Sequence, residues 1–125
     1  MLIRILLLVE ETRLRGQLAE ALSHLGVLVF DEPDKLKLWS RLGEESFDLV
    51  VATQSMLPAD VERSIAEIRE LPYRPEVIVL ANLSEPRERA ALQKGGAFAV
   101  VDRTLPLEQL GETLRTCLLY TSDAA

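Results

Sequence analysis

The apolar residues of the chain fall into five short runs. These runs consist mostly of valine, isoleucine and leucine, without a polar residue at every second position. Such continuous apolarity is typical of strands that are buried on both faces of a sheet. The runs cover residues 2–9, 27–30, 49–52, 77–80 and 98–101. We therefore predict five buried strands.

The segments that follow these runs carry apolar residues three or four positions apart, which is the spacing of one face of an α-helix. The stripes are Leu14, Leu18, Leu22 and Leu25; Leu36, Trp39 and Leu42; Val61, Ile65 and Ile68; Leu107, Leu110 and Leu114; and a weaker one around Ala90, Ala91 and Leu92. The spacing predicts five helices. We interpret Trp39 as a cover of the core, because an aromatic residue at helical spacing is more often core than interaction patch.

Turn-forming residues mark the expected helix ends: Ser84 with Pro86 and Leu105 with Pro106 at starts, and Gly26, Gly43, Gly95 and Gly96 at ends. Strict alternation of strands and helices with short connections favours right-handed crossovers and helices on both faces of the sheet. Five strands then predict a flavodoxin-like α/β fold, a doubly wound parallel sheet with strand order 2-1-3-4-5. A ligand site of this fold lies beyond the carboxyl ends of the strands.

Composition narrows the class of protein. A length of 125 residues fits one domain, and 48% hydrophobic with 27% charged residues fits an ordinary globular protein. The net charge of −6 repels phosphate backbones, so we expect no direct contact with nucleic acid. The apolar start is too short for a signal peptide and ends at Glu10, and no run has membrane length, so we predict a cytoplasmic protein. The single cysteine, Cys117, excludes an internal disulfide.

The last nine residues differ in character from the rest. Residues 117–125, with the sequence CLLYTSDAA, resemble a translated sequencing adapter rather than the natural end of a helix. We therefore predict a domain over residues 1–116 and a non-native tail over residues 117–125, with a further domain lost from the natural product. The alternative is that the fifth helix simply ends here.

Four of the predicted strands end at one edge of the sheet, where the residues that follow them gather. These residues are Glu10 and Glu11 after the first strand, Thr53 and Gln54 after the third, Ala81 and Asn82 after the fourth, and Asp102 and Arg103 after the fifth. Residues 49–59 contain no Asp or Glu. The third strand therefore brings no carboxylate to this edge.

Four segments together carry a family resemblance: ILLLVEE at 5–11, FDLVV at 47–51, VIVLA at 77–81, and Gly96-Ala97 leading to Arg103. Their content and spacing resemble the CheY-like receiver domain of bacterial response regulators. The resemblance implies a two-component phosphorelay in which an aspartate at the end of the third strand accepts a phosphoryl group. It also implies an acidic pair that holds Mg²⁺, a Ser or Thr after the fourth strand and a lysine on the fifth.

Carried over position by position, the resemblance implies a degenerate phosphorylation site. Its positions hold Glu10 and Glu11 for the acidic pair, Thr53 or Gln54 for the nucleophile, Ala81 for the hydroxyl residue, Val100 for the aromatic switch residue and Arg103 for the lysine. Two alignments that differ by one residue leave the choice between Thr53 and Gln54 open. We expect a pseudo-receiver without catalytic residues, Mg²⁺ or another cofactor, in which Glu10 and Glu11 are the candidates for a remnant metal pair.

Arg103 suggests a different use of the acidic pair. Without metal or phosphate, the carboxylates of Glu10 and Glu11 repel each other, and a guanidinium that reaches across the edge neutralises them. The hypothesis is that Arg103 holds the domain in one fixed state.

The resemblance implies a regulatory module and not an enzyme. It would act through protein contacts as the N-terminal domain of a longer regulator, for example a transcriptional one. The expected face for a homodimer or a protein partner comprises helix four, strand five and helix five, with the candidates Glu88, Leu92, Val100, Leu107 and Arg115. Two alternatives stay open: an atypical receiver that is still phosphorylated, and a flavodoxin-like ligand-binding domain or small enzyme. Against a ligand-binding domain or enzyme, the sequence has no Gly-rich phosphate loop and no nucleophile with a nearby base.

Overall fold

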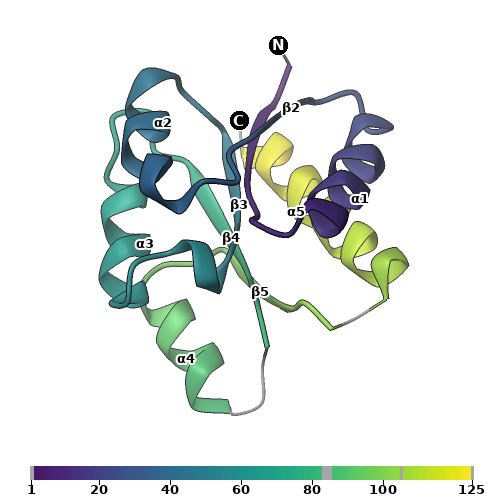
Figure 1. Cartoon of the computed structure of the whole chain (residues 1–125). Helices are drawn as coiled ribbons and strands as arrows, with labels where there is room; N and C mark the ends of the chain where they lie inside the picture. The colour runs from purple at the N-terminus through teal and green to yellow at the C-terminus, as the bar shows by residue number, and fades with distance from the viewer. Residues whose placement is uncertain (1, 83–85, 105, 125) are drawn as a thin grey trace.

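The computed structural model of the chain describes residues 2–82, 86–104 and 106–124. Its centre is a five-stranded sheet in the order β2-β1-β3-β4-β5, in which each neighbouring pair is parallel (Figure 1). The strands are β1 (Arg4–Leu8), β2 (Leu28–Asp31), β3 (Leu49–Thr53), β4 (Glu76–Ala81) and β5 (Ala99–Asp102). The predicted fold class and strand order are confirmed.

Helices cover both faces of the sheet. They are α1 (Thr12–Ser23), α2 (Leu38–Glu44), α3 (Val61–Arg69), α4 (Pro86–Lys94) and α5 (Leu107–Ala124), with the short 3₁₀ turns η1 (Lys35–Lys37) and η2 (Gln54–Met56). Helices α1 and α5 lie on one face, and α2, α3 and α4 lie on the other (Figure 1). The sheet is therefore the middle of three layers.

Each face of the sheet has its own apolar core, because successive strand residues point to opposite faces. In β1, Leu6 and Leu8 pack with α2, α3 and α4, whereas Ile5 and Leu7 pack with α1 and α5. All five residues of β3 are buried. The edge strand β2 differs from the prediction, because only its two middle residues are even partly buried. With a strand neighbour on one side alone, β2 stays open to solvent.

The predicted core stripe of the second helix is confirmed at Leu42 and wrong at Leu36 and Trp39. Leu36 is 93% exposed and Trp39 is 42% exposed, while Leu38 and Leu42 are buried. The Asp34 carboxylate accepts a hydrogen bond from the Leu36 N–H and caps η1, so that α2 begins only at Leu38. The cap shifts the buried helical face by two residues and leaves Leu36 in solvent.

The predicted helix ends are confirmed where the structure describes them, with one exception. Pro86 is the first residue of α4, and Gly26 and Gly96 follow α1 and α4 with φ values of 71° and 108°, in the left-handed region that favours glycine. Gly43 instead lies within α2. Ser84 and Leu105 lie outside the described residues.

Helix α5 extends beyond the predicted domain boundary at residue 116. Cys117 and Leu118 are each 5% exposed and belong to the core between α1, α5 and the sheet. Burial raises the pKa of the Cys117 thiol above its ordinary value. The adapter origin of residues 117–125 stays a prediction. Within the described part of the chain, no helix combines the length and the apolarity needed to cross a membrane.

Candidate functional site

The carboxyl ends of four strands bring the predicted site residues to one edge of the sheet. Thr53 is the last residue of β3 and pairs with Leu80 of β4, and Ala81 pairs with Asp102 of β5. Strand β1 ends two residues before Glu10. The parallel register therefore places residues from distant parts of the sequence beside one another.

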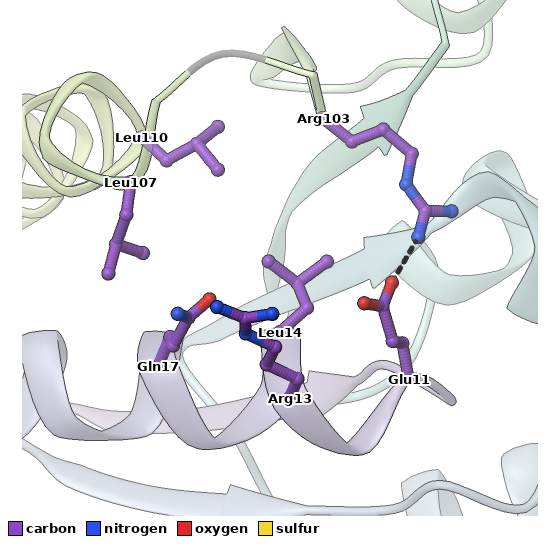
Figure 2. Close-up of a pocket in the computed structure, with 7 residues that line it drawn as sticks. All are labelled: Glu11, Arg13, Leu14, Gln17, Arg103, Leu107 and Leu110. Atoms are coloured by element: carbon purple, nitrogen blue, oxygen red, sulfur yellow. Dashed lines mark hydrogen bonds and ion pairs between the residues drawn. The ribbon is translucent and has the colours of Figure 1, made fainter.

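Arg103 reaches across this edge to the acidic pair. Its Nη2 lies 3.0 Å from the Glu11 Oε2, and the ion pair connects the end of β5 to the start of α1 (Figure 2). The Arg103 side chain is 23% exposed and that of Glu11 is 54% exposed. The backbone N–H of Arg103 donates to the Ala81 carbonyl at 3.0 Å, and this hydrogen bond positions the Arg103 backbone beside the end of β4. The predicted reach of Arg103 to the acidic pair is confirmed for Glu11, and the single fixed state stays a hypothesis.

Glu10 has a different partner, which the sequence did not indicate. The Ser55 hydroxyl donates a hydrogen bond to the Glu10 carboxylate and lies 3.3 Å from the Thr53 Oγ1. The Thr53 hydroxyl also donates to the Leu8 carbonyl at 3.5 Å, and its side chain is fully buried. Ser55 comes near β1 because η2 turns the chain back just after β3, which hydrophobic periodicity does not reveal. The two glutamates are therefore held separately.

Both candidates for the nucleophile position lack a carboxylate. Thr53 ends β3, and Gln54 begins η2 and is partly buried. Neither side chain can form an acyl phosphate, since that product requires a carboxylate oxygen as the attacking atom. The choice between the two alignments therefore does not change the chemistry available at this edge.

Ala81 and Val100 have a packing role. Both belong to the core beneath α3 and α4, with exposed fractions of 1% and 5%. The Val100 carbonyl accepts a hydrogen bond from the Arg89 Nη1 at 2.9 Å, which ties β5 to α4. The two positions that the resemblance assigns to a hydroxyl and to an aromatic residue therefore hold apolar side chains of the core.

The residues at this edge do not fit a Mg²⁺ site. Mg²⁺ requires several oxygen ligands in octahedral geometry, but Glu11 already binds a guanidinium and Glu10 accepts from Ser55. The third nearby carboxylate, Asp102, accepts hydrogen bonds from the Thr104 hydroxyl and N–H, which hold the Asp102 pKa below its ordinary value. Across residues 2–82, 86–104 and 106–124, no three acidic, histidine or cysteine side chains form a metal-binding group.

A polar pocket adjoins the Arg103–Glu11 ion pair. It has a volume of about 360 Å³ and lies between α1 and α5. Figure 2 shows the residues that line it: Glu11, Arg13, Leu14, Gln17, Arg103, Leu107 and Leu110. The pocket contains no nucleophile beside a base, so its lining offers no group for covalent chemistry.

The predicted interface residues lie in three different settings. Leu92 and Val100 are core residues with exposed fractions of 1% and 5%, so their side chains lie beneath the protein surface. Glu88 is partly buried on α4. Leu107 and Arg115 line a groove between α5 and α1 rather than the side of α5 toward α4. The interface through α4, β5 and α5 stays a prediction.

Solved structures with the same fold are receiver domains. The chain is similar to a CheY-like receiver domain protein from Methanospirillum hungatei, with a TM-score of 0.82, 15% identity and 100% of both chains covered. It is also similar to HP1043, an orphan response regulator of H. pylori, with a TM-score of 0.78, 16% identity and coverage of 91% of this chain and 94% of that one.

A third similar structure is a longer protein. NtrX from Brucella abortus matches with a TM-score of 0.78 and 16% identity, over 98% of this chain and 27% of the NtrX chain. No protein-family model matches the sequence, and no curated protein matches it either. The predicted resemblance is confirmed at the level of the fold, because the chain has the fold of response-regulator receiver domains.

Proposed function

We propose that this chain is a receiver-like signalling module that works without phosphorylation of its strand-three position. The observation that carries the proposal is the carboxylate-free exit of β3, where Thr53 and Gln54 stand beside an acidic pair already bound by Arg103 and Ser55. A phosphoryl group has no acceptor carboxylate on this segment. The cation that would balance its charge has no free acidic pair either.

The module acts through association with other proteins and catalyses no reaction. It is the N-terminal regulatory domain of a longer regulator, such as a transcriptional one, and the match to 27% of the NtrX chain supports a place as one domain of a longer protein. Contacts to a partner or a second copy run through α4, β5 and α5, where Glu88 lies partly exposed on α4. The degenerate positions then hold one conformation instead of switching between two.

Intact-mass spectrometry after incubation with a small acyl phosphate and Mg²⁺ tests the proposal. We expect no added phosphoryl group, because neither Thr53 nor Gln54 offers a carboxylate. A receiver domain that carries the strand-three aspartate serves as the positive control. A stoichiometric phosphorylated species would contradict the proposal and support the alternative of an atypical receiver that remains in a phosphorelay.

A titration with Mg²⁺ gives a second, independent test. The Arg103→Ala variant frees Glu11 from its ion pair and serves as the comparison. We expect the unaltered chain to show no saturable Mg²⁺ binding by calorimetry. Saturable binding by the unaltered chain would mean that Arg103 yields to the cation, and the fixed-state proposal would then fail.

A further inference from the structure

An exposed apolar residue projects from the surface at η1. Leu36 is 93% exposed, although it is a large apolar side chain, and it lies between Lys35 and Lys37. These are two of the three lysines in the chain, and neither forms an ion pair in the described part of it. Trp39, one helical turn further on, is 42% exposed. We call residues 35–39 the knob.

The knob has a fixed shape. The Asp34 carboxylate accepts from the Leu36 N–H at 2.9 Å, and the Lys37 N–H donates to the Asp34 carbonyl at 3.0 Å. The Ser40 hydroxyl then donates to the Lys37 carbonyl at 3.1 Å, which joins the turn to α2. Since the turn is already ordered, Leu36 can enter a pocket without the entropic cost of folding a loop.

An apolar groove lies on the opposite face of the molecule, between α1 and α5. It has a volume of about 540 Å³ and is lined by Ala21, Leu25, Leu107, Glu108, Gly111, Glu112 and Arg115. Figure 1 shows α1 and α5 on the side of the sheet away from α2. The knob and the groove therefore cannot meet within one copy of the chain.

Gly111 lies in the lining of the groove, next to open space. An added Cβ at Gly111 would meet no atom within 4 Å, so the space above this point of α5 is empty. Glycine inside a helix costs about 0.5–1 kcal/mol relative to alanine. Gly111 therefore weakens α5 slightly, at a point where a larger side chain would extend into the groove.

The charges of the two surfaces are opposite. Glu108 and Glu112 are exposed beside the apolar lining, and Arg115 is paired with Glu112 at 3.9 Å. The knob carries the positive charges of Lys35 and Lys37 on both sides of its leucine, and the Asp34 carboxylate lies at its base. Asp34 and Arg115 reduce the two surfaces to small net charges of opposite sign, positive at the knob and negative at the groove. Opposite charge around a central apolar contact favours one partner orientation and suppresses others.

We propose that the knob of one copy docks into the α1–α5 groove of a second copy, with Leu36 over Gly111 and the two lysines beside Glu108 and Glu112. The contact is heterologous, because each copy uses two different surfaces. It leaves one free knob and one free groove, so association continues head to tail into larger assemblies. The groove shares Leu107 and Arg115 with the candidates for the α4–β5–α5 interface, whereas the knob lies outside that interface. The test of this contact does not depend on phosphorylation.

Sedimentation of the full chain from micromolar to near-millimolar concentration tests the proposal. We expect the average mass to rise with concentration, and the fluorescence of the single tryptophan, Trp39, to shift to shorter wavelength as it loses water. Leu36→Asp should lower the association constant about tenfold or more. A chain that stays monomeric throughout, or whose association survives Leu36→Asp, overturns the proposal.

Two glycine variants provide a matched pair for the groove. Gly111→Leu fills the groove, whereas Gly16→Leu adds the same side chain to α1 outside it, and a Cβ at either position meets nothing within 4 Å. We expect only Gly111→Leu to abolish association. An equal loss in Gly16→Leu contradicts docking into the groove. If Gly111→Leu fails to fold, the double change Glu108→Lys and Glu112→Lys tests the same surface.

A mixture of two variants distinguishes the head-to-tail contact from a symmetric one. Leu36→Asp keeps an intact groove, and Gly111→Leu keeps an intact knob. Neither should associate alone, but together they should form a one-to-one dimer that grows no further, with the affinity of a single wild-type contact. Assemblies that grow beyond a dimer in the mixture, or no association at all, overturn the proposal.

Discussion

Arginine is used in two different ways at the two ends of the sheet. At the start of β1, the Arg4 guanidinium lies 4.6 Å from the centre of the Phe30 ring, and its Nε donates to the Ser46 carbonyl at 2.9 Å. At the carboxyl edge, the side chain of Arg103 is held in the described part of the chain by its ion pair with Glu11 alone. Arg4 is part of an aromatic cluster, whereas Arg103 lies among hydrated polar groups.

The aromatic cluster ties several elements together. Phe47 contacts Phe30 and Tyr73 edge to face, with ring centres 5.8 Å and 6.3 Å apart, and the Tyr73 hydroxyl donates to the Leu42 carbonyl at 2.8 Å. Arg41 lies 5.9 Å from the Phe30 ring centre. These contacts join β2, α2 and the loops before β3 and β4. We infer that this cluster contributes more to stability than the partly exposed ion pair at the carboxyl edge.

The largest expected effect comes from removing the centre of the aromatic cluster. Phe47 is 2% exposed, so Phe47→Ala should lower the free energy of unfolding by roughly 3–5 kcal/mol, through lost burial and a new cavity. Trp39→Ala is the control, since this exposed aromatic side chain should cost far less. Urea unfolding of both variants measures the difference. Similar losses would mean that the cluster does not dominate stability.

The second-largest expected effect is a loss of stability at alkaline pH that depends on Tyr73. Burial raises the Tyr73 pKa from 10.0 to about 12. The folded state therefore holds the phenol proton more tightly, so this contribution is complete below pH 10 and is lost as the pH rises toward 12. Tyr73→Phe should cost about 1 kcal/mol at neutral pH, because the hydrogen bond to Leu42 is lost. Unfolding measured across this pH window should show a steeper decline for the unaltered chain than for Tyr73→Phe.

The smallest expected effect is at the carboxyl edge. Arg103→Ala should change the free energy of unfolding by less than about 1 kcal/mol at low salt, because its partner Glu11 is half exposed. The difference should shrink at high salt, where the charges are screened. Arg4→Ala, measured beside it, should cost more and depend less on salt. An Arg103→Ala effect that is absent at every salt concentration would sink the idea that this arginine fixes the acidic pair.

Much of the fold followed from local sequence. The continuous apolar runs predicted all five strands to within two residues at each end, because a central parallel strand must be apolar on both faces. Four of the five helical stripes contain buried residues at half or more of their predicted positions or at their largest one, although Leu25 and Ala90 are exposed. The lack of a carboxylate in residues 49–59 likewise excluded an acyl phosphate on that segment before any geometry was known.

Other features depended on contacts between distant segments. Periodicity placed Leu36 and Trp39 in the core, but the cap at Asp34 changed where α2 begins and so which face is buried. The partner of Glu10 was missed for a similar reason, since Ser55 reaches it only through the turn of η2 and the register of β3 with β1. No sequence pattern reports such a contact across 45 positions.

The sequence by itself determined the layered α/β fold and the lack of a carboxylate in residues 49–59, because strand burial and side-chain chemistry are properties of residue type. Only the tertiary structure decided that Arg103 pairs with Glu11 and not with Glu10. Only the structure, too, revealed a knob at Leu36 and an open groove at Gly111 on opposite faces. These features arise from capping, register and helix packing, which bring together residues that no local pattern connects.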